Sequence, residues 1–134
     1  MDVGAPSNFA RMEDLFARKW TLMKRQIRGF AFDDEQTRTA IREVHATTGY
    51  VIDPHGAVGY LAAEEWRVEH PEHTQVIFET AHPAKFLDVM EEELGKGVVE
   101  IPERLACLAE REKVVVPMEA DEEKFLAWLQ GELG

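Results

Sequence analysis

The sequence lacks most features that mark secreted or membrane proteins. Its 134 residues include a single cysteine, Cys107, which excludes an internal disulfide framework and fits a reducing compartment. No apolar run approaches the roughly 20 residues that a membrane-spanning helix needs. The first residues show no cationic region followed by an apolar one, so they do not form a signal peptide. We therefore expect a cytoplasmic protein with no membrane partner.

Positive charge is also scarce. Lys and Arg number 15 against 26 Asp and Glu, which gives a formal net charge of −11. Nucleic-acid binding needs clustered cations, so we expect no nucleic-acid partner. A short basic cluster near the N-terminus consists of Arg18, Lys19, Lys24, Arg25 and Arg28. We interpret this cluster as a solvated helix face, with binding of an acidic partner as the alternative.

Several motifs of common catalytic chemistry are missing. The sequence has no glycine-rich phosphate loop and no Gly-x-Ser-x-Gly elbow. Cys107 lies in a helical pattern of leucines, which indicates a half-buried structural thiol rather than a nucleophile. His70 and His73 are three residues apart, but Pro71 between them predicts a turn and not a helical ligand pair. We therefore expect no metal site.

Apolar periodicity divides the chain into three stretches. Residues 7–48 are predicted to be helical, because apolar side chains recur there at spacings of three and four. Residues 50–95 are predicted to form strand-loop-helix units, and residues 100–134 a largely helical tail. This alternation predicts an α/β class in which helices alternate with a few short parallel strands.

The predicted strands are short. One is the apolar run at residues 50–52, and the other is residues 74–79, whose centre at 76–78 is apolar on both faces, as in a buried parallel strand. Two strands make a poor independent sheet. We therefore expect residues 1–134 to be a single portion of a larger α/β domain.

Polar loops follow both predicted strands, at residues 53–56 and 79–83. In open α/β sheets ligands bind beyond the carboxyl ends of strands, and a proline in each loop fixes a helix start whose free N–H groups favour anions. Gly56 and Gly59 in the next helix predict a close approach by another backbone or a ligand, because glycine weakens a helix. The sequence thus predicts that residues 76–86 form one wall of a small-molecule site, with simple helix capping as the alternative.

Four motifs in order resemble the C-terminal part of threonine synthase. They are MDVGAPSNF at 1–9, GYVIDPHGAVGY at 49–60, ETAHPAKF at 79–86 and IPERL at 101–105. The resemblance covers almost the whole chain, and the motif at 79–86 is the most specific. It implies a pyridoxal-phosphate enzyme of fold type II, the tryptophan-synthase-β type, and a carbon–oxygen lyase that converts O-phospho-L-homoserine and water to L-threonine and phosphate.

The resemblance also implies roles for individual residues. In that fold a hydroxyl residue at a late strand end meets the pyridine nitrogen of the cofactor, and Thr80 occupies the corresponding position. A neutral hydroxyl does not hold the ring nitrogen protonated as a carboxylate does, so the cofactor would be a weaker electron sink. The other residues that the resemblance places at the wall of the active site are His82, Lys85, Asp53, His55, Ser7 and Asn8.

Two parts of the family pattern have no counterpart here. They are the lysine that forms a Schiff base with the cofactor and the loop that holds its phosphate; Lys85 lies in the wrong motif to be that lysine. Met1 falls at an internal methionine of the pattern. We therefore predict a C-terminal fragment that alone is inactive, does not bind pyridoxal phosphate, and pairs with the missing N-terminal part or with itself. The alternative is a non-catalytic small-molecule or partner-binding domain derived from this fold.

Overall fold

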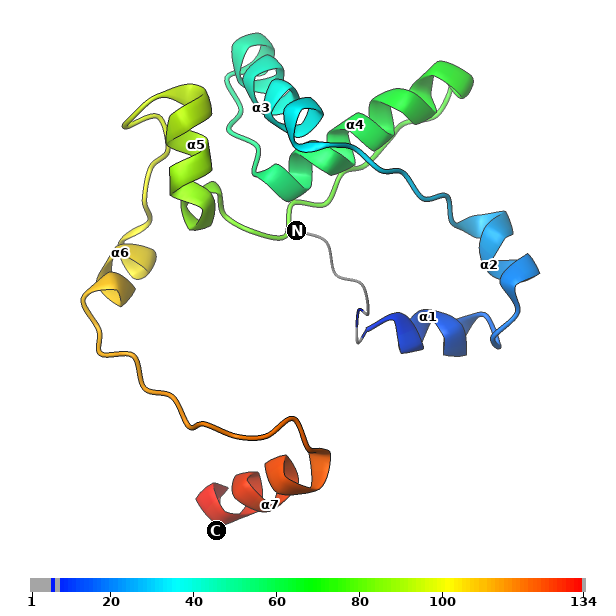
Figure 1. Ribbon diagram of the computed structural model, residues 1–134. Helices are drawn as coiled ribbons and strands as arrows, with labels where there is room; N and C mark the ends of the chain where they lie inside the picture. Colours follow the sequence, from blue (N-terminus) through cyan, green and yellow to red (C-terminus); the bar gives the residue numbers. More distant parts are fainter. Residues whose placement is uncertain (1–5, 7, 134) are drawn as a thin grey trace. The chain divides into compact units, whose positions relative to one another are not determined.

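A computed structural model describes residue 6 and residues 8–133, which are mainly helical. The elements are α1 (Phe9–Leu15), α2 (Trp20–Gln26), α3 (Asp34–Thr48), α4 (Pro54–Glu69), the 3-10 helix η1 (Pro83–Phe86), α5 (Leu87–Leu94), α6 (Glu103–Ala109) and α7 (Glu122–Leu133) (Figure 1). The chain divides into two compact units, Met1–Glu100 and Ile101–Gly134. That the chain is one portion of a larger domain stays a prediction.

The predicted α/β class is wrong, because no strand occurs in the part of the chain that the structure describes. Residues 50–52 and 74–79, predicted to be strands, are irregular. A strand needs a neighbour that pairs with its backbone N–H and C=O groups, and no described segment provides one. The apolar residues of the second segment are consequently open to solvent, with Val76 73% and Phe78 82% exposed. The class of this chain is mainly helical.

Strong end signals define α3. The Asp33 carboxylate accepts a hydrogen bond from the Gln36 backbone N–H at 2.8 Å, and the Gln36 side chain accepts one from the Asp33 N–H at 2.9 Å. This capping box satisfies two otherwise unpaired donors. Gly49 ends the helix in the left-handed region with φ 73°, where glycine carries no steric penalty. Its buried face consists of Ala40, Ile41 and Val44.

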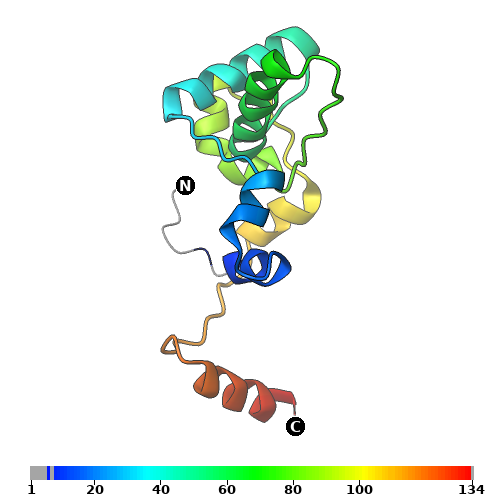
Figure 2. The same ribbon diagram turned by 90° about the vertical axis from the view of Figure 1, so that its right-hand side faces the viewer.

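Helix α3 is the centre of the first unit and packs against both α4 and α5. Figure 2 shows the same three helices adjacent from a second direction. Ile41 of α3 and Met90 of α5 are fully buried between them. Ion pairs reinforce the α3–α5 contact, because Glu93 accepts hydrogen bonds from both Arg38, at 2.5 Å, and Arg42.

The second unit contains α6 and α7, joined by an irregular segment that is exposed from residue 110 to 121. No residue of α6 is buried. On α7, the Phe125 and Trp128 rings lie 6.1 Å apart, and both side chains remain largely exposed. Among the described residues, no helix is both long and apolar enough to cross a membrane.

Candidate functional site

The candidate site lies where the irregular segment before η1 passes the start of α4. A cavity of about 410 Å³ opens there. Its lining comes from three parts of the first unit and includes Tyr50, Val51, Glu79, His82, Val99 and Glu100. The predicted polar loop at 79–83 lines this cavity. The loop at 53–56 is not part of the lining and meets the second loop where Gly56 faces the Glu79 carboxyl. The strands that were expected to carry both loops are absent from the described chain.

Asp53 anchors the first of these loops. Its side chain is completely buried, and Oδ1 accepts hydrogen bonds from the backbone N–H groups of His55 (2.6 Å) and Gly56 (3.2 Å). Asp53 therefore caps α4, as the alternative interpretation of this loop expected. Its second oxygen, Oδ2, is also buried and has no hydrogen-bond partner. Buried polar atoms are nearly always paired, so an unpaired buried carboxylate oxygen is unusual.

The Glu79 side chain, from the second loop, lies against Gly56 in the first turn of α4. A Cβ atom built on Gly56 would overlap the Glu79 carboxyl group, lying 2.5 Å from Cδ, and would also lie 2.8 Å from Cγ1 of Ile52. Only glycine at position 56 leaves room for this carboxyl. At Gly59, an added Cβ would lie 3.2 Å from Cγ2 of Ile77. A close approach occurs at both glycines, but side chains of the segment 77–79 make it and not the backbone or ligand that was predicted.

The environment changes the acidity of Glu79. Burial of its carboxyl group, and next the neighbouring Asp53 carboxylate, raise the pKa of Glu79 to about 7. Desolvation and a nearby like charge both disfavour the ionised form of a carboxylic acid. Near neutral pH, Glu79 is therefore able to donate a hydrogen bond. Glu79 is not among the site residues predicted from the sequence, although Gly56 predicted a close approach at this position.

Two histidines lie in this region, His55 beside Asp53 and His82 in the cavity lining with Glu79. His55 Nδ1 lies 3.4 Å from Asp53 Oδ1, and the His55 ring lies 5.1 Å from that of Phe86. His82 Nδ1 accepts a hydrogen bond from the Ala84 backbone N–H at 3.2 Å and so caps η1. An accepting Nδ1 places the proton of the neutral ring on Nε2. This leaves Nε2–H of His82 free to donate to a ligand.

The structure gathers some of the predicted site residues but not all. Asp53 and His55 lie at the start of α4, and His82 precedes η1 and lines the cavity. Thr80 is exposed and lies between Glu79 and Ala81, which line the cavity, but it is not itself part of the lining. Lys85 is exposed on η1. Asn8 is exposed and precedes α1 without capping it through its side chain, and Ser7 lies outside the described residues. The ligand roles of these residues stay predictions.

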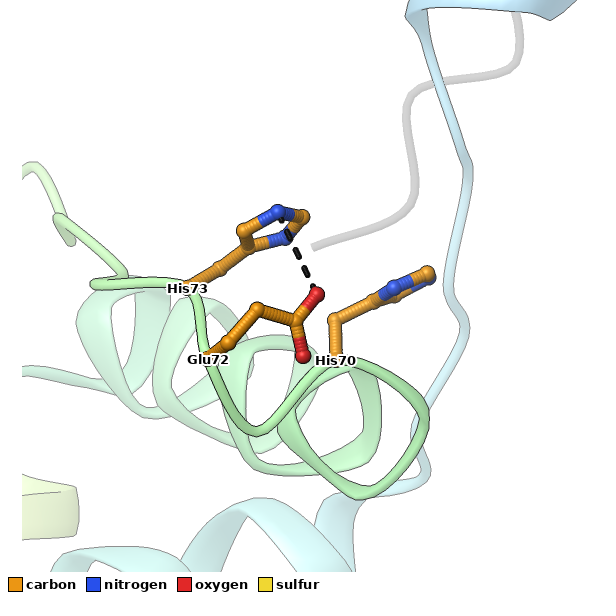
Figure 3. A group of neighbouring side chains, drawn as sticks. All are labelled: His70, Glu72 and His73. Atoms are coloured by element: carbon orange, nitrogen blue, oxygen red, sulfur yellow. Dashed lines mark ion pairs between the residues drawn. The ribbon is translucent and has the colours of Figure 1, made fainter.

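A second group of polar side chains follows α4 (Figure 3). Ligand-type atoms of His70, Glu72 and His73 all lie within 4.8 Å of one another, because the turn at Pro71 folds both histidines to the same side. The His70 ring stacks on Trp66 at 4.0 Å, and His73 lies 3.5 Å from the Glu72 carboxylate. Ring stacking and this ion pair account for the arrangement, and the absence of a metal site stays a prediction.

A second hollow of about 340 Å³ lies between α4 and the segment 75–78. Its lining includes Phe30, Ala63, Trp66, Gln75, Val76 and Phe78. The Gln75 Nε2 amide is buried and lacks a partner. Arg28 lies at one side of this region, paired with Glu69 at 2.7 Å and placed 5.3 Å from the Trp66 ring. The hollow is thus largely apolar, with one unsatisfied polar group.

Comparison with known proteins identifies the class of this helical chain as the C-terminal region of an enzyme family. A family model described as "Threonine synthase, C-terminal" matches residues 56–127. The match begins at Gly56, which accommodates the Glu79 carboxyl, and includes the whole motif at 79–86. No solved structure matches the chain.

Similar proteins give the same result. The threonine synthase of Escherichia coli is 39% identical over 107 residues, which are 79% of this chain and 24% of that protein. The threonine synthase of Pseudomonas aeruginosa is 37% identical over 106 residues, 76% of this chain and 22% of that protein. The chain belongs to the threonine synthase family and corresponds to its C-terminal part. It spans about a quarter of the length of these curated relatives.

Proposed function

We propose that this chain supplies one wall of a threonine synthase active site and has no activity alone. The reaction is the conversion of O-phospho-L-homoserine and water to L-threonine and phosphate, in the cytoplasm. The observation that carries the proposal is the position of the motif at 79–86, which borders a cavity and brings the Glu79 carboxyl and the His82 imidazole to it. No lysine is among the described residues that line this cavity, so the lysine that holds the cofactor must come from elsewhere.

The residues present fit part of a pyridoxal-phosphate site. When bound, the cofactor supplies the electron sink for the reaction. Thr80 is exposed next to the cavity-lining Glu79 in sequence, and its neutral hydroxyl suits the ring nitrogen. His82, through Nε2–H, and the exposed Lys85 carry donors that suit an anionic substrate. These groups bind and orient; none of them replaces the lysine or the phosphate loop.

The partner in this proposal is the part of the enzyme that precedes this region in the relatives. Those relatives are about four times as long as the matched part of this chain. Val76 and Phe78 are exposed beside an apolar hollow, and Gln75 Nε2 is buried without a partner. Exposed apolar surface of this kind marks interaction sites. Covering it with the preceding chain would bury the apolar side chains and bring polar groups to Gln75.

A chimera tests the proposal. It joins this chain to the preceding part of the Escherichia coli relative, about three quarters of that protein. We expect phosphate release from O-phospho-L-homoserine and visible absorbance of the bound cofactor. Thr80→Val should lower phosphate release about tenfold or more, the equivalent of one lost hydrogen bond. Thr21→Val, at an exposed position of α2, is the matched control and should leave phosphate release unchanged.

The alternative function is a non-catalytic domain that binds a small molecule or a partner. The observation that favours it is that the cavity of about 410 Å³ is formed within the first unit alone. The chimera separates the two functions. A chimera that folds and binds the cofactor but releases no phosphate contradicts the enzyme proposal and supports the non-catalytic one.

A further inference from the structure

The two carboxyl groups of Asp53 and Glu79 form an arrangement that the proposed function does not use. Asp53 is fully buried, and the two donors that it receives both bind to Oδ1. Oδ2 has no partner among the described residues. The Glu79 carboxyl occupies the space that a side chain at position 56 would fill, next to the Gly56 N–H, which donates a hydrogen bond to Asp53 Oδ1. The backbone at the start of α4 thus leaves room for a second carboxyl beside the first.

Glu79 is an exposed residue, but its carboxyl lies at the first turn of α4 beside the fully buried Asp53. Two ionised carboxylates there would repel one another, because the buried Asp53 charge is poorly screened by water. A single proton removes the repulsion and also supplies the donor that Asp53 Oδ2 lacks. We infer that Asp53 and Glu79 share one proton, and that this carboxyl pair fastens the segment carrying Thr80 and His82 to the first turn of α4. The proton belongs on Glu79, since Oδ1 of Asp53 already accepts hydrogen bonds from two backbone N–H groups.

The role of the pair is positioning. Glu79 directly precedes Thr80, so a fixed Glu79 carboxyl restrains the backbone that presents the Thr80 hydroxyl. The inference concerns this chain itself and does not require the proposed function. Other titratable groups around the pair and its cavity are His55, Tyr50, His82 and Glu100.

The shared proton makes the fastening dependent on pH. The pKa of Glu79 is about 7 in the folded chain, against an ordinary value of 4.5. The folded chain therefore holds this proton more tightly than the unfolded chain does. The stabilisation is complete below pH 4.5, declines as the pH rises, and is lost above about pH 7. Above that pH, repulsion from Asp53 should free the segment 79–82.

The test is a carboxyl-carbon NMR titration of the 134-residue chain. We expect one glutamate carboxyl to titrate with a midpoint near 7, well above the ordinary 4.5. Asp53→Asn should return this midpoint toward 4.5, because the asparagine amide can still cap α4 but brings no negative charge. Glu79→Gln should abolish the high-pH titration, because glutamine does not ionise. Its amide N–H can still replace the shared proton as a donor to Asp53.

Glu100→Gln is the matched control, because it removes a carboxyl from the wall of the same cavity; the high midpoint should persist. Direct observation of carboxyl carbons keeps the titration of His55 and His82 from being mistaken for that of Glu79. A wild-type chain in which every glutamate titrates near 4.5 overturns the inference without any variant. A midpoint near 7 that is unchanged in Asp53→Asn also overturns it, because burial alone would then explain the shift.

Discussion

Helix α3 and the segment 74–79 both carry apolar side chains, but these side chains lie in opposite environments. Ile41 of α3 is fully buried, whereas Val76 is 73% exposed. A helix pairs its own backbone groups and needs one packed face to be stable. A strand must find its hydrogen-bond partners on another segment. The difference teaches that the helices pair their own backbone groups and bury one face within the first unit, while the segment 74–79 has no pairing partner among the described residues.

The largest expected effect is loss of stability when the buried region is altered. Ile41→Ala removes three carbon atoms from a fully buried side chain that α4 and α5 enclose. We expect a loss of about 2–5 kcal/mol in the free energy of unfolding, measured with denaturant. Val76→Ala is the control at the exposed segment and should change stability by less than about 0.5 kcal/mol. Equal losses in the two variants would remove the contrast between the regions.

Gly56→Ala tests the contact between the helical part, at the start of α4, and Glu79 of the segment 74–79. The added methyl group would overlap the Glu79 carboxyl and lie 2.8 Å from Ile52 Cγ1. We expect a loss of about 1–3 kcal/mol, as for overpacking elsewhere. Combining it with Glu79→Ala should recover part of this loss, because the side chain that must move is gone. Gly131→Ala, where an added Cβ meets nothing within 4 Å, should instead stabilise α7 by up to about 1 kcal/mol.

Glu93 should show the opposite pH dependence to Glu79. Hydrogen bonds from Arg38, and further from Arg42, lower the pKa of Glu93. A lowered pKa means that the stabilisation is present above the ordinary value of 4.5 and disappears as the pH falls through the folded value. Glu93→Gln should therefore lower the melting temperature at neutral pH and reduce the loss of stability in acid.

Glu69→Gln is the control for Glu93→Gln, because the Arg28–Glu69 pair is exposed on both sides. Exposed pairs contribute little, so its effect on the melting temperature should be the smaller one. A larger effect from the exposed pair would show that the α3–α5 contact is not what Glu93 stabilises.

The smallest effect on the isolated chain should come from the most exposed apolar residue in the segment. Phe78 is 82% exposed, so Phe78→Ser should leave the melting temperature of this chain nearly unchanged. In the chimera, the same change should lower the melting temperature markedly, because the preceding chain is expected to cover Phe78. No difference between the two backgrounds would contradict the proposed docking of the preceding part.

Sequence signals located the helices well where the ends are chemically marked. Asp33 and Gly49 delimit α3, and Asp53 with Pro54 opens α4. The strand predictions were wrong for a physical reason. Apolar content describes the side chains of a segment, but it does not show whether another segment is present to pair with its backbone. The carboxyl pair also escaped prediction, because residues 53 and 79 are brought together by tertiary structure. The one indication in the sequence was Gly56, which predicted that another group approaches the helix closely at that position.

The most direct test of the proposed function is a phosphate-release assay on the 134-residue chain alone and on the chimera. Both receive O-phospho-L-homoserine and pyridoxal phosphate at the same protein concentration. We predict release by the chimera, and none by the chain alone above a control without protein. Turnover by the chain alone would contradict the claim that this region supplies one wall of the site while the preceding region supplies the cofactor's anchor.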